Sequence, residues 1–117
     1  MINPERGEVW QVDLNPTIGD EMGKRRPVIV ISENSVGRLA LRVIVPITDW
    51  KERYSAFPWM TQLVPDGKNG LSKPSSADAF QIRSLSVMRF VSKLGKLSVA
   101  DVDAIAEAIV LTVGYTP

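Results

Sequence analysis

Apolar and polar positions alternate or form short blocks along most of this chain, which predicts a protein built mainly from β-strands. Between residues 8 and 14 apolar and polar side chains alternate with the period of two expected of a half-buried strand. The β-branched runs at 28–31 and 43–47 are short enough to be strands that are buried on both faces. Two further strands are expected at about 59–64 and 77–84, separated by a turn-forming segment.

The face assignment within 77–84 bears on function. If this segment is one strand, Gln81 and Arg83 share a face with the small Ala79, while Phe80 and Ile82 lie on the other face. An arginine and a glutamine beyond a small residue are suited to hold phosphate or to read base edges. The same pattern also describes an ordinary polar outer face.

The last segment has the 3.6-residue period of an amphipathic helix. Ser98 is expected to cap its beginning and Gly114 to end it. One apolar stripe is expected to dock on the sheet or on a partner, and it consists of Val102, Ile105, Ala106, Ile109 and Val113. Strands first and one helix last predict a mainly β fold, a small antiparallel barrel or half-barrel closed by a C-terminal helix, with residues 1–117 as a single domain.

The composition excludes several classes of catalytic and metal site without identifying one. The 117 residues include no cysteine and no histidine, which excludes disulfides, thiolate chemistry, the usual zinc sites and every Ser-His mechanism. An enzyme of this composition has to use carboxylates, arginine, lysine, hydroxyls, amides and backbone dipoles. The sequence shows no pattern for a metal ion or a cofactor. No run is long enough to span a membrane and no signal-peptide pattern opens the chain, so a cytoplasmic protein is expected.

Charge is unevenly distributed although the net charge is only +1. Residues 61–97 hold an excess of lysine and arginine, whereas residues 98–117 hold acids and no cation. Two solvated faces explain this distribution, and a basic surface for a polyanion explains it as well if other cations converge there.

Three adjacent cations stand directly before the apolar run at 28–31. Pro27 restricts the backbone of Arg26 to extended geometry, so its guanidinium is expected at a fixed place at the mouth of the strand. A fixed guanidinium is a good phosphate clamp, although an ion pair with Asp20 or Glu21 is an equally simple explanation. Lys24 and Arg25 are expected to attract and hold a polyanion.

Two further segments carry candidate chemistry. Thr48 ends the apolar strand at 43–47, where its hydroxyl is expected either to cap the next turn or to donate to a phosphate near Arg26. Residues 50–59 interleave lysine and arginine with four aromatic residues, among them Phe57. Such rings suit stacking on unpaired bases, and they equally suit a small core or a dimer contact.

Taken together, these segments resemble the MazF/PemK (Kid) family of toxin endoribonucleases. The matching pieces are "RGEVWQVDLNPTIGDEMGKRRPVIVIS" at 6–32, "VIVPIT" at 43–48, "GL" at 70–71 and "SSADAFQIRSL" at 75–85. The resemblance covers nearly the whole chain. It implies a small SH3-like barrel of the CcdB/PemK kind that forms a homodimer, cuts single-stranded RNA at short sequences without a metal or other cofactor, and is inhibited by a cognate antitoxin.

The resemblance also implies roles for individual residues. It assigns catalysis to Arg26 and Thr48, with Glu21 as the base or as an organiser of its loop. Together with the cations and the aromatic loop described above, it gives a set of RNA-binding residues that consists of Lys24, Arg25, Phe57, Ser75, Gln81 and Arg83.

The chain departs from the family pattern at one position. Many members carry an acid immediately before the glutamine, where this chain has Phe80, and Asp78 is expected two residues earlier on the same strand face. Two other functions stay open at this point: a CcdB-like toxin that poisons gyrase, and a non-catalytic RNA-binding barrel. The gyrase toxin would not require Arg26 and Thr48 to lie together, and the RNA-binding barrel would still bind RNA after Arg26→Ala but would produce no cut ends.

Overall fold

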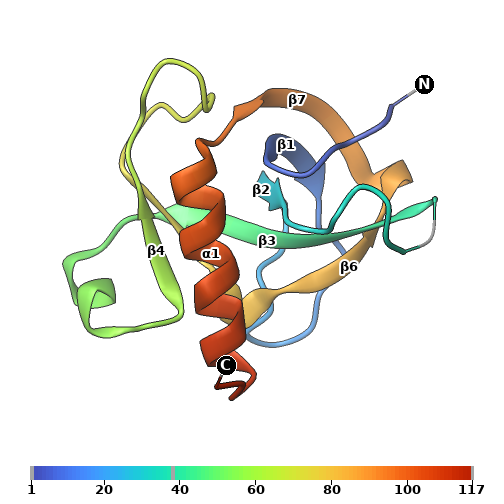
Figure 1. Ribbon diagram of the computed structural model, residues 1–117. Helices are drawn as coiled ribbons and strands as arrows, with labels where there is room; N and C mark the ends of the chain where they lie inside the picture. Colours follow the sequence, from blue (N-terminus) through green and yellow to red (C-terminus); the bar gives the residue numbers. More distant parts are fainter. Residues whose placement is uncertain (1, 38, 117) are drawn as a thin grey trace.

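The computed structural model describes residues 2–37 and 39–116, which form a seven-stranded antiparallel sheet and a C-terminal α-helix (Figure 1). The strands are β1 (Glu8–Asp13), β2 (Arg25–Val30), β3 (Leu41–Asp49), β4 (Met60–Leu63), β5 (Ser75–Asp78), β6 (Arg83–Ser86) and β7 (Phe90–Lys96). The helix is α1 (Val99–Thr112), and the short 3₁₀ helices are η1 (Glu52–Ala56), η2 (Ala79–Gln81) and η3 (Val87–Arg89). No helix in the described part of the chain is both long and apolar enough to cross a membrane.

The strand order is β4-β5-β3-β2-β1-β7, and β6 also pairs with β3. The nine-residue β3 is the central element, because β6 pairs with its first half, β5 pairs with its end and β2 lies along its other side. Among the described residues no pairing joins β4 to β7, so the closed barrel expected from the sequence is not detected. The expectation of a mainly β antiparallel fold with a C-terminal helix is confirmed.

Side chains of β1, β2 and β3 are buried on both faces of the sheet, as the β-branched runs predict. One core lies between the sheet and α1 and includes Val9, Ile29, Val45, Ile47 and Ile105. The other core lies on the opposite face and includes Trp10, Val12, Val28, Val30 and Ile44. Successive residues of one strand therefore contribute to different cores. Polar side chains are accommodated only at the strand ends that extend beyond the two cores.

The helix begins and ends where the sequence predicts. The hydroxyl of Ser98 accepts a hydrogen bond from the backbone N–H three residues on at 3.2 Å, and Gly114 follows the helix with a positive φ of 77°. Val102 and Ile105 are buried, as expected. The expected stripe is wrong at its end, because Val113 is 69% exposed and Ala108 is buried in its place.

The prediction of one strand at 77–84 is wrong. Five residues, 78–82, lie between the pairings Ala77–Ile47 and Arg83–Ile44, whereas β3 has only two residues in the same interval. The excess chain forms η2, which begins where the carboxylate of Asp78 accepts a hydrogen bond from the N–H of Phe80 at 3.0 Å. Consequently Gln81 and Arg83 do not share a strand face, and neither do Asp78 and Phe80.

Candidate functional site

The beginning of β2 and the end of β3 meet at one edge of the sheet. Val28 pairs with Pro46 in this antiparallel ladder, so continuing the register by two residues sets Arg26 opposite Thr48. The guanidinium of Arg26 is partly fixed, because its Nε donates a hydrogen bond to the carbonyl of Gly23 at 3.1 Å. The two terminal nitrogens of this guanidinium are not used in that bond, so Arg26 can still bind an anion.

A cavity of about 490 Å³ lies at this edge. Its polar lining includes Arg25, Arg26, Thr48, Asp49, Lys73 and Ser75. Four of the residues predicted for the site are thereby brought together. Three cations and one carboxylate line the cavity, so its charge favours an anionic ligand.

The far wall of the cavity comes from the segment between β4 and β5. Gly70 approaches the backbone of Leu94 in β7 so closely that a Cβ at this position would overlap its carbonyl group. The N–H of Lys96 also donates to the carbonyl of Lys68 at 2.9 Å, which fixes the same segment to β7. At its other end the hydroxyl of Ser75 donates to the carbonyl of Lys73 at 2.9 Å. The backbone around the cavity is therefore held on both sides.

Glu21 and Gln81 lie outside this cavity and act on the loop between β1 and β2. The carboxylate of Glu21 accepts a hydrogen bond from the N–H of Ile18 at 2.7 Å. The side-chain amide of Gln81 donates to the carbonyl of Asp20 at 3.2 Å, and its oxygen accepts from the N–H of Met22 at 3.2 Å. Both contacts organise the loop that precedes the three cations.

Three other predicted RNA-binding residues also lie outside the cavity lining. Lys24 is exposed in the loop with φ of 64°, and its N–H donates to the side-chain oxygen of Asn15 at 2.8 Å. Arg83 is half-buried at the start of β6, opposite Ile44 of β3. Phe57 is half-buried and stacks on Trp59.

A chain of aromatic rings extends from the end of β3. Trp50 contacts Tyr54 edge to face at 6.0 Å between ring centroids, and Tyr54 contacts Phe57 at 6.1 Å. Phe57 stacks face to face on Trp59 at 4.8 Å, and Trp59 contacts the 67% exposed Phe80 at 5.9 Å. The rings pack mainly on one another, which leaves Phe80 as the exposed end of the chain.

Burial raises the pKa of Asp78 above its usual range, against hydrogen bonds from the N–H groups of Phe80 and Gln81 that lower it. Asp78 is 7% exposed, and its carboxylate caps the start of η2. It is not part of the cavity lining. Within the described residues no group of three or more histidine, cysteine, aspartate or glutamate side chains is placed to hold a metal ion.

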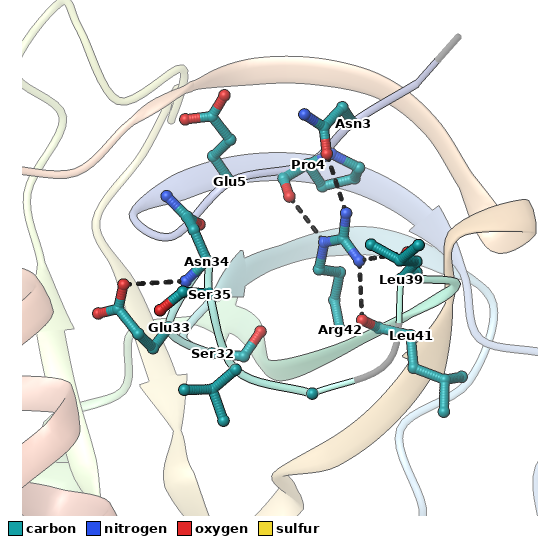
Figure 2. A pocket seen from close by; sticks show the side chains of 12 residues that line it. Asn3, Pro4, Glu5, Ser32, Glu33, Asn34, Ser35, Leu39, Leu41 and Arg42 are labelled. Carbon is teal, nitrogen blue, oxygen red and sulfur yellow. Dashed lines mark hydrogen bonds between the residues drawn. The ribbon is translucent and has the colours of Figure 1, made fainter.

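A second cavity of about 490 Å³ lies beside the N-terminal segment (Figure 2). The guanidinium of Arg42 donates hydrogen bonds to the carbonyls of Pro4, Leu39 and Leu41 and to the side-chain oxygen of Asn3, at 2.7–3.0 Å. This arginine ties the chain terminus to β3, and four of its five N–H donors are used in these bonds. The second cavity therefore lacks the available cations of the first one.

Sequence reasoning missed Asp49 and Lys73 at the main cavity. Their side chains form an ion pair of 3.0 Å. Asp49 directly follows Thr48 and Lys73 stands two residues before Ser75, so both are next to residues that the sequence singled out. Nothing in the local pattern indicated that the two would meet.

Comparison with known proteins gives a uniform result. The family model described as "PemK-like, MazF-like toxin of type II toxin-antitoxin system" matches residues 5–113. Endoribonuclease MazF9 of Mycobacterium tuberculosis is 33% identical over 112 residues, which cover 91% of this chain and 92% of that protein. The crystal structure of MazF from Deinococcus radiodurans superimposes with a TM-score of 0.80 at 22% identity, covering 97% of this chain and 99% of the other. An endoribonuclease from a mycobacterial species, in complex with its cognate antitoxin, has a TM-score of 0.76 at 21% identity, with 97% and 98% covered.

Proposed function

This chain belongs to the PemK-like, MazF-like toxin family of type II toxin–antitoxin systems and is an endoribonuclease, and we propose that it cleaves single-stranded RNA at specific short sequences without a metal ion. The proposed products are a 2′,3′-cyclic phosphate and a 5′-hydroxyl end. The observation that carries the proposal is the cavity in which Arg26 and Thr48 converge with a second arginine and a lysine.

The proposed reaction needs three things from the cavity. A base accepts the proton of the 2′-oxygen as this oxygen bonds to phosphorus, the phosphorane gains negative charge, and the 5′-oxygen takes a proton as its bond to phosphorus breaks. Arg26 is suited to stabilise the charge and to protonate the leaving oxygen, because a guanidinium offers N–H donors and no acceptor. Thr48 is suited to donate a hydrogen bond to a non-bridging oxygen. Removing one such donor typically costs about 2.7–4 kcal/mol of transition-state stabilisation, which is a hundredfold or more in rate.

Of the two roles open to Glu21, base or organiser of its loop, the geometry supports the second. Because its carboxylate accepts from the N–H of Ile18 and it does not line the cavity, we propose that it organises the loop rather than acting as the base. On this proposal Glu21→Gln, whose side-chain oxygen still accepts that hydrogen bond, retains most of the activity.

The proposed RNA contacts divide by position. Arg25 and Ser75 line the cavity and are proposed to hold the phosphates next to the scissile one. Lys24 and Arg83 are proposed to bind RNA outside the cavity, and Phe57 to stack on a base beyond it. These positions fit a strand of RNA that crosses the cavity and continues past the aromatic rings.

The test uses purified protein and a long single-stranded RNA in the presence of EDTA. Mapped ends should fall at repeated short sequences and carry 5′-hydroxyl groups. Arg26→Ala should lower kcat by a hundredfold or more. Lys93→Ala, which removes an exposed lysine outside the cavity, should cut like the parent. Uncut RNA in EDTA, or an Arg26→Ala variant as active as the parent, would contradict the mechanism.

The partners proposed for this chain are a second copy of itself and a cognate antitoxin. The similar mycobacterial endoribonuclease was solved with its antitoxin, which supports the second partner. An antitoxin segment that is acidic and apolar would complement the cations of the cavity and the neighbouring aromatic rings. Hydrogen exchange of residues 50–59 should slow when the antitoxin is added, and unchanged exchange there would count against this surface. Sedimentation should give the mass of a homodimer.

A further inference from the structure

Asp49 and Lys73 form an exposed ion pair inside the lining of the main cavity. The Nζ of Lys73 lies 3.0 Å from Oδ1 of Asp49, and the two side chains are 62% and 61% exposed. Their backbones are well fixed, because Asp49 pairs with Ser75 and the N–H of Trp50 donates to the carbonyl of Pro74 at 3.1 Å. Only the side chains are free to rearrange.

The pair contrasts with the other ion pair of the described residues. Glu8 lies 2.8 Å from Lys93, is 12% exposed, and also accepts hydrogen bonds from the indole of Trp10 and from the N–H of Glu5. Asp49 accepts no second hydrogen bond among the described residues, so Lys73 is its single partner there. An exposed pair of this kind is weak and screened by salt. A stronger anion in the cavity can therefore displace Asp49 from Lys73.

We propose that Lys73 is an RNA-binding residue and that Asp49 competes with the RNA phosphate for it. In the free protein Asp49 holds Lys73 at the rim, and a phosphate that enters beside Arg26 and Thr48 takes the ammonium from the carboxylate. Asp49 thereby lowers the affinity for every polyanion and makes binding depend on a phosphate that reaches into the cavity. This inference rests on the proposed cleavage of RNA, since it needs a phosphate in the same cavity.

Binding is measured with an oligodeoxynucleotide that has the sequence of the mapped cleavage site, because it carries the phosphates and lacks the attacking 2′-hydroxyl. Lys73→Ala should weaken binding about threefold to fivefold at low salt and make the salt dependence shallower by about 0.7 in the slope of log K against log salt. Lys73→Arg should bind nearly as the parent does. Asp49→Asn should bind about threefold more tightly. Lys93→Ala is the matched control, since it removes a lysine that is ion-paired outside the cavity, and it should bind like the parent.

The double variant separates competition from simple repulsion. If Asp49 only repels phosphate, Asp49→Asn strengthens binding equally with and without Lys73. If Asp49 competes for Lys73, the gain is larger when Lys73 is present. Equal gains, or a Lys73→Ala variant that binds like the parent, would overturn the inference. The Lys73 and Asp49 variants should keep the parent's thermal unfolding midpoint within a few degrees, because this pair is exposed on both sides.

The two proposals fail in different ways. A parent protein that leaves RNA intact would contradict the proposed cleavage. A parent that cuts RNA, with Lys73 and Asp49 variants that bind the oligodeoxynucleotide unchanged, would contradict only the role of this pair.

Discussion

Gln81 connects the η2 turn to the loop between β1 and β2, and removing its amide should loosen that loop. The side chain makes two hydrogen bonds of 3.2 Å to backbone groups of Asp20 and Met22. A neutral hydrogen bond contributes about 0.5–1.5 kcal/mol, and the half-buried position lets water replace part of each bond. Gln81→Ala should therefore lower the free energy of unfolding by about 1–2 kcal/mol.

Two measurements test this value. Urea denaturation gives the loss in unfolding free energy, and amide exchange reports the loop directly. The N–H of Met22 loses its acceptor, so it should exchange about tenfold faster in the variant if local opening becomes easier by about 1.4 kcal/mol. Gln62→Ala is the matched control, because Gln62 is exposed on β4 and its amide makes no hydrogen bond to the described residues. It should change neither quantity.

The outcome also decides between two roles of Gln81. The family resemblance implies contact with RNA, whereas the geometry makes it a tether of the loop that leads to Arg26. If Gln81→Ala lowers cleavage while the exchange of the Met22 amide and the unfolding free energy stay unchanged, the reasoning about the tether is refuted and direct RNA contact is favoured. If exchange, stability and cleavage change together, the tether is supported.

Three further changes test the packing, a buried acid and the helix cap. Gly70→Ala should lower the unfolding free energy by about 1–3 kcal/mol more than Gly67→Ala. Both glycines have positive φ, but only a Cβ at Gly70 overlaps the backbone of Leu94. Equal losses of unfolding free energy in urea denaturation would contradict this. Burial raises the pKa of Asp78 above its usual value of 3.8, so between these two values the folded state binds more protons than the unfolded state. The parent should therefore lose stability as pH rises through that window. Asp78→Asn should lack this loss, and parallel pH–stability curves for the two proteins would refute it. Ser98→Ala should cost about 1 kcal/mol by removing the cap of α1, and urea denaturation with an unchanged midpoint would argue against the cap.

The elements that the sequence predicts well are those whose burial is visible in the local pattern. The strand around 8–14 and the helix after Ser98 have apolar positions at the period of their own structure, and the strands at 28–31 and 43–47 are continuous apolar runs buried on both faces. β7 shows no such period, because most of its side chains are exposed on a strand that β1 holds by backbone pairing. A strand of this kind is determined by its partner rather than by its own residues.

The break between β5 and β6 has a similar cause. Residues 77–84 do show alternation, yet the interval on β3 has room for only two residues opposite five. The length of a segment between two pairings is a property of the whole sheet, so the pattern could not reveal η2. The predicted shared strand face of Gln81 and Arg83 was wrong for the same reason, since it depended on one continuous strand.

The candidate site was predictable in part. Arg26 and Thr48 follow from strand ends and from the family resemblance, and the ladder of β2 and β3 brings them to one edge. Asp49 and Lys73 meet through the β3–β5 pairing although they are far apart in the sequence. No motif marks such a contact, which appears only when the register is known.

The crowding of charge at the entrance to β2 has a physical explanation in the two cores. β2 is buried on both faces from Val28 onward, and a charged side chain is costly to bury there. The charged residues of β2 are therefore confined to its beginning, at the edge of the sheet. Antiparallel pairing sets the end of one strand beside the start of the next, so the polar end of β3 has to lie at that same edge. Thr48 and Asp49 therefore lie near Arg26, because the paired interiors of β2 and β3 are buried and exclude polar side chains. The two buried cores thus place the polar side chains of Arg26, Thr48 and Asp49 at the edge of the sheet where the cavity lies.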